Sequence, residues 1–531
     1  MKLDDHAIET LTAMSAAELA AGIAGKQFTS REVVQAHIDR IEATHEQLNA
    51  VVVPRFEQAL TEADGADAVV RRGEPLLPLH GVPITVKEMF DVKGTPTTVG
   101  ILARRRHVAT DDAVMVRRLR NAGAIILGKT NVPQLALMIE TDNPVYGRTN
   151  NPWNVERSPG GSSGGEAAII AAGGSPLGLG SDGAGSIRQP AHACGICGFM
   201  PTSGRLSVEG HWSFRGFPPG ATQPGPMART ADDIILAMQI LDDTTRDTPG
   251  NPERLRRPAT PALQDAKAVP IDTLRVGVVY EEGYIPTGSS VRRAVRTAAE
   301  ALKGQCLSVE EVQIPDGREV WDLFLSFMNA DGGYFARQAL AGTTADWRIA
   351  ELASINAIPN VLRSAGTWMM RSLGQRYLAD ALRAVPRRRL SMPRYLALFD
   401  RLTTYRKKFD DLFEQRQLDL LLCPVNSVPA VPHGCRFANY SIIFSMFVNL
   451  LGLPAGTVPV TRVAERDPLT LPTGRDRVLR DLASAEANAV GLPIGVQLIG
   501  RKWYDEQVLA IMSSLQSRLR SDPDYPQCPV G

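Results

Sequence analysis

The chain has 531 residues, of which 44% are hydrophobic, and its 58 basic and 57 acidic side chains leave a formal net charge of +1. A balanced charge provides no overall attraction for nucleic acid. Six cysteines are too few for a disulfide framework in so long a chain, and the N-terminus MKLDDHAIE lacks the basic-then-apolar pattern of a signal peptide. We therefore expect a cytoplasmic protein with a large core.

Two helices are predicted within residues 1–50. Ser15 with Glu18, and Thr29 with Glu32, have the spacing of a capping box, in which a hydroxyl and a carboxylate satisfy free backbone N–H groups at a helix start. Apolar residues then recur at helical spacing between positions 33 and 41.

Strands and helices alternate along the rest of the chain. The segment LHGVPITVKEMFDV is a predicted strand, and DDAVMVRRLRNAGAIILGKTN has the pattern of a helix, a glycine stop and a strand. The alternation recurs at LRVGVVY, in a helix from Ser290 to Leu302 and at CLSVEEVQI. It ends with LDLLLCPV, GLPIGVQLIG and a helix from Asp505 to Leu519. This order predicts an α/β fold.

Two further segments are predicted to be helical. The apolar stretch from Ile442 to Leu453 is shorter than the ~20 residues that cross a bilayer, so we expect a buried helix and no membrane span. Residues 316–400 are rich in aromatic side chains. They form either a helical lid or variable insertion, or ordinary helix core, which the tendency of aromatic side chains to be buried favours.

Several motifs suggest functions that their surroundings contradict. GAIILGKT, residues 123–130, spells a P-loop, but the residues between its glycines form a predicted strand. CGIC, residues 194–197, lacks a second ligand pair and is interpreted as two buried thiols.

The histidines include no HExxH motif, so we predict no metal and no other cofactor. GGSSG, residues 160–164, follows a polar loop and not the strand that a nucleophile elbow requires. The arginine runs 104–106 and 387–389 are interpreted as solvated surface.

The candidate chemistry lies in the most glycine-rich part of the chain. Residues 160–185 hold 10 of the 46 glycines, yet EAAIIAA and SPLGLGSD within them predict a buried helix and a strand, which a flexible linker would lack. The small side chains before the candidate nucleophile leave the backbone N–H groups uncrowded, as an oxyanion hole requires. The predicted oxyanion-hole donors are Gly183, Ala184, Gly185 and Ser186.

The segment SPGGSSGGEAAIIAAGGSPLGLGSDGAGSIRQPAHACGICGFMPTSGRLS closely resembles the signature of the amidase signature family of serine hydrolases. LHGVPITVKEMFDVKG, GKTNVPQL, NPVYGRTNNPWN, PAGTVPV and GLPIGVQLIG extend the resemblance over most of the chain, and SSGGE and CGICG are most similar to the fatty acid amide hydrolase branch. The resemblance implies an α/β fold with a large central mixed sheet covered by helices on both faces. It also implies a single domain over residues 1–531, with helices in 1–50, a catalytic core in 80–215 and the lid or insertion in 316–400.

Carried over by motif, the family's triad falls on Ser186 as nucleophile, Ser162 as bridging serine after a cis peptide bond, and Lys87 as base. A proton would then pass from Ser186 to Ser162 and on to Lys87. Ser163 is expected to hydrogen-bond the lysine. Asp182 and Arg188 are expected to pair and hold the nucleophile loop, although an ordinary surface pair has the same residue types. The expected supporting residues are thus Ser163, Asp182 and Arg188.

The base requires an environment that removes its charge. A free lysine titrates near ~10.4, so a neutral amine near pH 7 needs a pKa lowered by roughly three units. Apolar residues at positions 84, 86, 89 and 90 flank Lys87, and in an extended segment Glu88 faces the opposite side. A surface lysine on a strand is the alternative that the residues alone leave open.

One position departs from the family's pattern. The family usually has two glycines before the nucleophile, whereas Ala184 takes the first of those places here. An alanine still donates its N–H, but a backbone with φ > 0 there would cost about 1 kcal/mol or more. The departure bears on the geometry of the oxyanion hole and not on the identity of the nucleophile.

The resemblance also suggests a hydrophobic substrate. LALMIE, together with Ile442 to Leu453, matches the part that lines the acyl pocket, although simple core packing would have the same composition. The residues expected to bind substrate are Leu135, Ala136, Leu137, Met138 and Ile139.

Three functions stay open at this point. The first is an amidase acting on hydrophobic acyl or aryl amides, and the second is a carbamate (urethane) hydrolase or esterase with the same triad. The third is the glutamine-hydrolysing component of an amidotransferase complex. Against the third, the segment after GKTN lacks the polar, serine-rich run usual in that component. We expect a small amide or carbamate as the partner, and a homodimer stays open.

Overall fold

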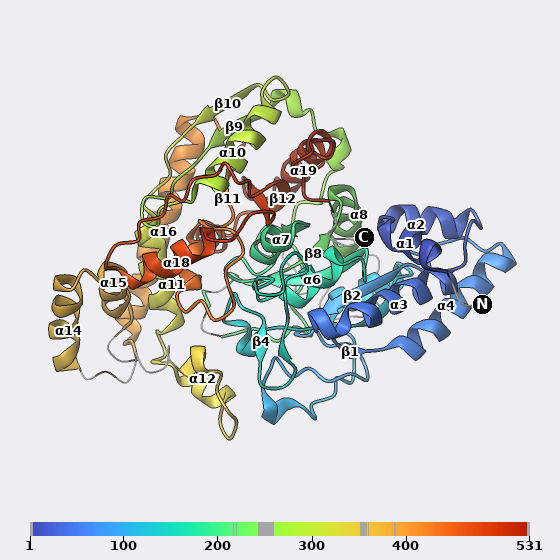
Figure 1. Ribbon diagram of the computed structural model, residues 1–531, viewed down its shortest axis with the longest axis horizontal. Coiled ribbons are helices and arrows are strands. Elements are labelled where there is room, and N and C mark those ends of the chain that lie inside the picture. Colours follow the sequence, from blue (N-terminus) through green and yellow to red (C-terminus); the bar gives the residue numbers. More distant parts are fainter. Residues whose placement is uncertain are drawn as a thin grey trace.

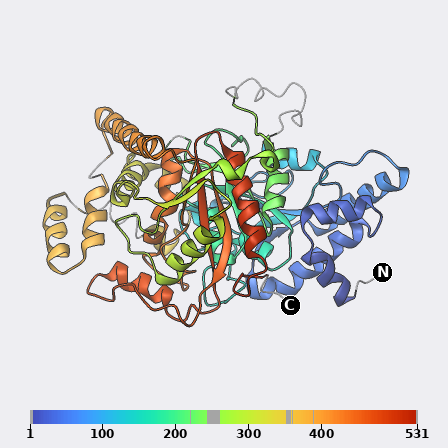
Figure 2. The same ribbon diagram turned by 90° about the horizontal axis from the view of Figure 1, so that it is seen from above.

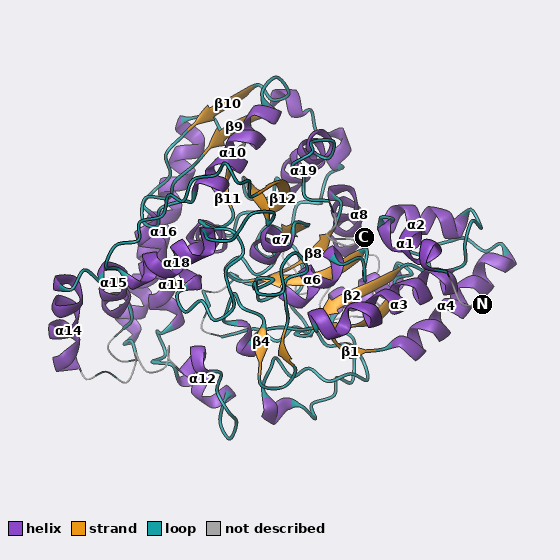
Figure 3. Cartoon of the chain, viewed as in Figure 1, coloured by secondary structure: helices purple, strands orange, loops and turns teal. Residues whose placement is uncertain are grey.

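The computed structural model describes residues 4–215, 217–218, 220–242, 260–350, 358, 360–386 and 389–527. Within these ranges, a mixed sheet of 11 strands has the order β1-β3-β2-β6-β8-β7-β12-β13-β11-β9-β10. Its strands are β1 (Val51–Pro54), β2 (Pro83–Lys87), β3 (Ile125–Thr130), β6 (Leu177–Asp182), β7 (Cys197–Met200), β8 (Gln223–Ala228), β9 (Arg275–Val278), β10 (Ser308–Glu311), β11 (Leu420–Pro424), β12 (Ala455–Arg462) and β13 (Pro493–Gly500). The sheet crosses the molecule from β10 at one edge to β1 at the other (Figures 1 and 3).

The helices lie around this sheet and at its two ends. In the first half of the chain they are α1 (Asp5–Ala13), α2 (Ala16–Ala24), α3 (Ser30–Leu48), α4 (Phe56–Arg72), α5 (Val114–Asn121), α6 (Gly164–Ala171), α7 (Arg188–Cys194) and α8 (Ala231–Asp242). In the second half they are α10 (Ser289–Leu302), α11 (Gly317–Met328), α12 (Tyr334–Ala339), α14 (Asn360–Ser372), α15 (Arg376–Ala384), α16 (Met392–Gln415), α17 (Ile443–Leu451), α18 (Arg477–Glu486) and α19 (Asp505–Leu519). Seen from above, the N-terminal helices and the helices of residues 360–415 lie at opposite ends of the molecule (Figure 2).

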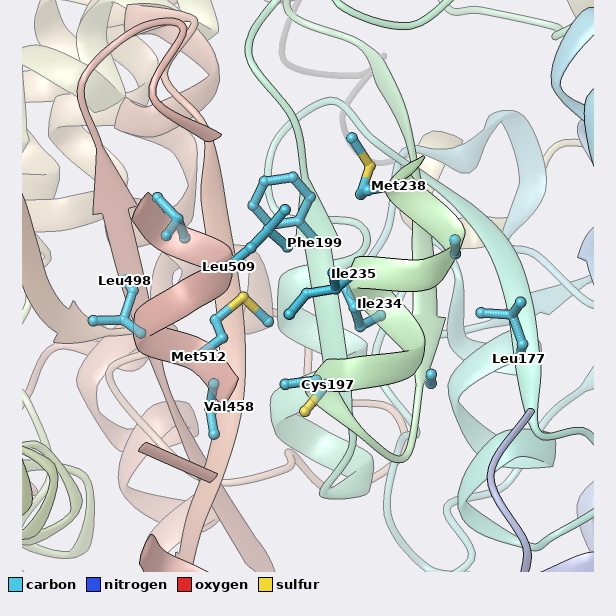
Figure 4. Close-up of a cluster of buried hydrophobic side chains, with 14 of the residues drawn as sticks. Leu177, Cys197, Phe199, Ile234, Ile235, Met238, Val458, Leu498, Leu509 and Met512 are labelled. Carbon is cyan, nitrogen blue, oxygen red and sulfur yellow. The ribbon is translucent and has the colours of Figure 1, made fainter. Parts of the chain in front are cut away.

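Strand β6 shows how the sheet is covered on both faces. Alternate residues of a strand face opposite sides. Leu177 and Leu179 pack into the large core with α8 and α19, where Ile234 and Met512 also lie (Figure 4). On the other face, Gly178 and the next glycine along the strand leave room for α6 and the start of α7. The predicted mixed sheet with helices on both faces is confirmed.

The N-terminus differs from expectation in one respect. Both predicted capping boxes are present, at the starts of α2 and α3. A further helix, α1, precedes them, so the prediction of two helices is wrong. Asp4 caps α1 by accepting the Ala7 N–H, but it has no carboxylate partner three residues on, and the capping-box pattern therefore missed it.

The described part of the segment 316–400 is helical, as predicted. It forms α11, α12, α14, α15 and the start of α16. Trp321 and Phe324 are buried, while Trp368 is 72% exposed. Residues 351–357, 359 and 387–388 lie outside the described residues, and they include the arginines at 387 and 388.

Candidate active site

Lys87 is the last residue of β2, which runs between β3 and β6 and is the third strand from the β1 edge of the sheet. Thr85, two residues earlier, hydrogen-bonds Glu166 of α6, so the side chain of Lys87 points to the same face as Thr85. The lysine is fully buried. Its Nζ lies 2.8 Å from Ser162 Oγ, 3.0 Å from Ser181 O and 3.0 Å from Ser181 Oγ.

The surroundings of Lys87 favour the neutral amine. Burial lowers its pKa from 10.5 to about 7, although the carboxylates of Asp182 and Glu166 act in the opposite direction. Glu88 faces away, as expected, and accepts the N–H groups of Thr98 and Val99. A substantial fraction of the lysine is therefore uncharged at neutral pH, which is the state that a base needs.

Ser162 lies two residues before the start of α6 and is buried, and the Gly161–Ser162 peptide bond is cis. The Gly161 N–H donates to Gln189 Oε1 at 2.8 Å, and the Ser163 N–H donates to Ser186 O at 3.1 Å. These two bonds join the segment before α6 to the first turn of α7 and to the loop between β6 and α7, so Ser162 and Ser186 are brought close together.

Ser186 lies in that loop, which a buried ion pair holds in shape. Asp182 Oδ1 accepts the Gly185 N–H at 2.7 Å, and Asp182 Oδ2 accepts the Ile187 N–H at 3.1 Å. Arg188 Nε lies 3.0 Å from Asp182 Oδ2, and both side chains are fully buried. This pair lies in the core and not on the surface.

The loop offers fewer oxyanion-hole donors than the four expected. The Gly185 N–H is taken by Asp182, so it is not available to a substrate. Within the described residues, the N–H groups of Gly183, Ala184 and Ser186 have no hydrogen-bond partner in the protein. The backbone of Ala184 is outside the positive-φ region, whereas Gly185 has φ +110°. The alanine is accommodated because the glycine after it adopts the special conformation.

The lysine's supporting serine is Ser181 and not Ser163. Ser163 Oγ donates to Ser181 O at 3.3 Å, whereas Lys87 contacts both oxygens of Ser181. The prediction for Ser163 is wrong because α6 begins at the next residue and turns the Ser163 side chain toward β6. Ser181 Oγ also lies 2.9 Å from His211 Nε2. No motif indicated His211, since it lies 30 residues from Ser181.

The expected substrate-binding segment forms a wall beside Ser186, with one exception. Ala136, Leu137, Met138 and Ile139 line a cavity, whereas Leu135 is completely buried behind them. Leu135 and Ala136 both have positive φ, at 58° and 55°. Two consecutive left-handed residues turn the chain sharply, which directs Leu135 into the core and the following residues toward the cavity.

The cavity has a volume of about 830 Å³ and Ser186 lies on its surface. Its lining is mostly apolar and comes from the wall 136–139, from α11, α12, α15 and α17, and from the segments near residues 214–217 and 436–442. Aromatic and aliphatic members include Phe217, Trp321, Phe324, Leu378, Tyr440, Ile442 and Met446. Four arginines also line it: Arg337, Arg348, Arg436 and Arg477.

The end of the wall is anchored by a charged cluster. Glu140 lies 2.9 Å from His433 Nδ1 and 3.0 Å from Arg348 Nη2. Arg348 also pairs with Asp142 and Asp346. The contact with His433 and the Arg348 guanidinium lower the pKa of the Glu140 carboxyl. Glu140 therefore acts as an anchor for the wall and does not line the cavity.

The P-loop-like segment and the CGIC segment both have structural roles. Residues 125–130 of the P-loop-like segment form β3, and Lys129 Nζ contacts Pro96 O and Thr97 Oγ1. Cys194 and Cys197 are buried, and burial raises the pKa of both thiols. Across the described ranges, no three His, Cys, Asp or Glu side chains gather so as to hold a metal ion. None of the helices in the described part of the chain has the length and apolarity of a membrane span.

Fatty-acid amide hydrolases and amidotransferase components are among the proteins that this chain resembles. The Amidase family model matches residues 32–509. Fatty-acid amide hydrolase 1 of Sus scrofa is 33% identical over 453 residues, which cover 82% of this chain and 75% of that protein. The A-type component of glutamyl-tRNA(Gln) amidotransferase from Anaeromyxobacter dehalogenans (strain 2CP-C) is 31% identical over 529 residues, covering 96% of this chain and 97% of that protein. A solved fatty acid amide hydrolase superposes with a TM-score of 0.81 at 26% identity, covering 99% of this chain and 88% of that chain.

The chain belongs to the amidase signature family, because the family model covers most of its length. The buried lysine and the two serines lie on the segments that carried the resemblance. The resemblance inferred from the signature segment is confirmed. The protein is accordingly an amide-hydrolysing enzyme.

Proposed function

We propose that the enzyme hydrolyses amides of hydrophobic acyl or aryl acids, with Ser186 as the nucleophile, Ser162 as the proton relay and Lys87 as the base. One observation carries this proposal. Ser186 faces a large apolar cavity, while the amine that would receive its proton lies fully buried behind Ser162, with a pKa of about 7. Nucleophile and base thus have the separate environments that each requires.

In the first half of the reaction, Ser186 Oγ attacks the substrate carbonyl and its proton passes to Ser162, whose own proton passes to Lys87. The N–H groups of Gly183, Ala184 and Ser186 are the donors free to stabilise the resulting oxyanion. The ammonium of Lys87 then returns a proton through Ser162 to the departing amine, and the acyl group stays on Ser186.

In the second half, water attacks the acyl-enzyme and its proton passes through Ser162 to Lys87. The bond between the acyl group and Ser186 Oγ then breaks, the carboxylic acid leaves, and Ser186 recovers its proton by the reverse route. The apolar chain of the acyl group occupies the cavity between the wall 136–139 and α17. Burial of apolar surface contributes about 25 cal/mol for each Å² removed from water, so each further methylene raises affinity until the cavity is filled. The polar amide alone contacts the loop around Ser186.

Glutamine hydrolysis is a weaker candidate, although amidotransferase components are among the relatives. Glutamine carries an α-ammonium and an α-carboxylate, and buried charges need partners. Of the described residues that line the cavity, none is Asp or Glu, so none would pair the ammonium. Met138, Ile139 and Ile442 supply apolar surface near the nucleophile instead.

A carbamate or ester presents its carbonyl to the same groups, so the geometry favours neither over an amide. Turnover of a long-chain fatty anilide, acetanilide, a phenyl carbamate and glutamine on one preparation separates the candidates. We expect the fatty anilide to have the highest kcat/KM. Faster cleavage of the carbamate would indicate a urethanase, and faster cleavage of glutamine would overturn the proposal.

The assignment of the triad is tested on the same preparation. Ser186→Ala and Lys87→Ala should each abolish most turnover, and a fluorophosphonate should label the parent enzyme but not Ser186→Ala. Ser175→Ala is a matched control, because Ser175 is buried and its hydroxyl, the only group that the substitution removes, donates to Leu177 O. Unchanged turnover in Lys87→Ala would exclude the proposed base.

A further inference from the structure

A histidine that the triad does not include is connected to the lysine through a single hydroxyl. His211 Nε2 lies 2.9 Å from Ser181 Oγ, which lies 3.0 Å from Lys87 Nζ. On its other side, His211 Nδ1 lies 2.9 Å from Ser213 Oγ. The imidazole packs against Phe90, with ring centroids 4.6 Å apart, and a backbone bridge joins the same two residues. The ring is therefore fixed on two sides.

Counting donors settles the direction of these bonds when the lysine is charged. An ammonium has three hydrogens and no lone pair. Its three neighbours are Ser162 Oγ, Ser181 O and Ser181 Oγ, and each of them must accept. Ser181 then has its own hydrogen left to donate, and His211 Nε2 is the acceptor at hydrogen-bond distance. The arrangement that also gives the Ser181 hydrogen an acceptor has the His211 proton on Nδ1, where it is donated to Ser213.

Two arrangements are open when the lysine is neutral, because an amine has two hydrogens and one lone pair. If Ser181 still donates to His211, the two hydrogens go to the oxygens of Ser181 and the lone pair faces Ser162. Ser162 can then transfer its proton to Lys87. If Ser181 instead donates to the lysine, the lone pair is occupied, Ser162 becomes an acceptor, and the relay points the wrong way.

We propose that His211 is a positioning residue for the reaction: by accepting the Ser181 hydroxyl at Nε2, it keeps the lone pair of Lys87 available to Ser162. The inference rests on the proposed Ser186–Ser162–Lys87 relay. The same tautomer serves the charged and the neutral lysine, so no hydrogen bond of His211 has to reverse during turnover. His211 has this role because the Ser181 hydroxyl contacts both Lys87 and His211 but can donate its hydrogen to only one of them.

Charged groups around this pair act on the lysine more than on the histidine. Asp182 on β6 and Glu166 on α6 face Lys87 and favour its ammonium. Burial lowers the pKa of His211 to about 3, and the charge of Lys87 acts in the same direction. The imidazole therefore stays neutral, and able to accept at Nε2, over the whole range of an activity assay.

A pair of nearly isosteric variants tests the role of the acceptor. His211→Gln places an amide oxygen close to the position of Nε2, whereas His211→Met has a similar shape with only a weak acceptor. We expect His211→Gln to keep kcat/KM within a fewfold of the parent, and His211→Met to lose at least roughly tenfold, since positioned proton transfer contributes 10²–10⁴-fold. The loss should fall on kcat and leave KM unchanged.

A double variant separates positioning from packing. In His211→Met the Ser181 hydroxyl has lost its acceptor and is free to donate to Lys87. The loss of kcat in this variant is therefore caused by the Ser181 hydroxyl. Adding Ser181→Ala to His211→Met should therefore restore kcat to the level of Ser181→Ala alone. In His211→Met the acid limb of the pH profile should also move to lower pH, because a donor to the neutral amine lowers the pKa of Lys87.

Three results would overturn the inference: equal rates for His211→Gln and His211→Met, a double variant no faster than His211→Met, or an acid limb that does not move. His211→Leu replaces His211→Met in every comparison if thermal unfolding shows that the methionine variant is not folded. The proposed relay is judged separately, by whether Lys87→Ala retains activity. If Lys87→Ala is inactive and the histidine variants are equal, the relay stands and only the role of His211 is rejected.

Discussion

At the scale of single residues, the protonation state of Lys87 is decided by a competition between burial and charge. Two carboxylates, Asp182 and Glu166, favour the ammonium, but complete removal from water favours the amine more strongly. Burial also raises the pKa of Glu166 to about 7, despite its bonds to Thr85 and Thr130. Glu166 is therefore partly neutral at pH 7, and its electrostatic stabilisation of the Lys87 ammonium is correspondingly weaker.

A pH dependence follows from the state of Lys87. The base is active when it has lost its proton, so kcat/KM should rise as the pH increases through about 7, the pKa of the amine. At pH 6 the rate should be roughly a tenth of its plateau, because one pH unit below a pKa leaves about that fraction deprotonated. Steady-state rates from pH 5 to 9 measure the limb, and a flat profile would contradict the assignment.

The two small residues before Ser186 should respond differently to substitution. Gly185→Ala places a side chain on a backbone with φ +110°, and its Cβ would lie 2.5 Å from Ser445 Cβ. We expect a loss of at least ~1–3 kcal/mol in unfolding free energy and loss of turnover. Ala184→Gly is the matched control and should change stability by less than about 1 kcal/mol, since Ala184 has an ordinary backbone. Urea unfolding and kcat/KM measure both variants, and equal effects would contradict this explanation.

At the scale of elements, the cavity is formed by segments that are far apart in the sequence. The wall 136–139 and the loop containing Ser186 belong to the first half of the chain, whereas α11, α12, α15 and α17 belong to the second. Helix α12 has no fully buried residue, although Ala336 and Ala339 pack against a core cluster that includes Leu135 and Met138. Substitutions there should change substrate preference at little cost to folding.

Ala336→Trp tests the contribution of α12. Ala336 lines the cavity and is half-buried, so an indole there would extend into the space proposed for the acyl chain. We expect kcat/KM for a long-chain anilide to fall by about tenfold, equivalent to ~1.4 kcal/mol of lost acyl contact, with little change for acetanilide. Gln338→Trp is the control, because Gln338 lies on the same helix, is exposed and does not line the cavity. An equal loss for both substrates would show that the cavity does not hold the acyl chain.

At the scale of the whole molecule, one buried arginine joins the two halves of the chain. Besides Asp182, Arg188 donates to Gln497 Oε1 on β13 at 2.9 Å and to Asn449 Oδ1 on α17 at 2.6 Å. Asn449 in turn donates to Asp182 Oδ1 at 3.0 Å. The nucleophile loop, the cavity helix α17 and the C-terminal strand therefore share one polar network, in which the guanidinium holds the pKa of Asp182 below its usual value.

Arg188→Leu should disrupt this network. It leaves the Asp182 carboxylate buried without its charge partner, and removal of one member of a buried pair costs about 3–5 kcal/mol. Arg292→Leu breaks an exposed pair with Glu281 and should cost less than ~1 kcal/mol. Urea unfolding of the two variants gives the comparison. Equal midpoints would show that the Asp182–Arg188 pair does not stabilise the fold.

Periodicity and local chemistry were sufficient to predict much of the fold. The capping boxes placed the starts of α2 and α3, and the last helix was predicted with the bounds that α19 has. Helix α1 was missed because a single capping aspartate is a weak local signal. The wall showed the same limit, since nothing in LALMIE indicates that the chain turns through two left-handed residues and buries Leu135.

The amino-acid sequence by itself determined the class of the fold, the family and the positions of the three proposed catalytic residues, because helix and strand periods and a long motif are properties of neighbouring residues. Only the tertiary structure decided that Ser181 contacts Lys87, that His211 contacts Ser181, and that the Gly185 N–H is occupied. Those contacts join residues from different elements, and the low pKa of Lys87 depends on every group that excludes water from it. Such contacts exist only after the chain has folded.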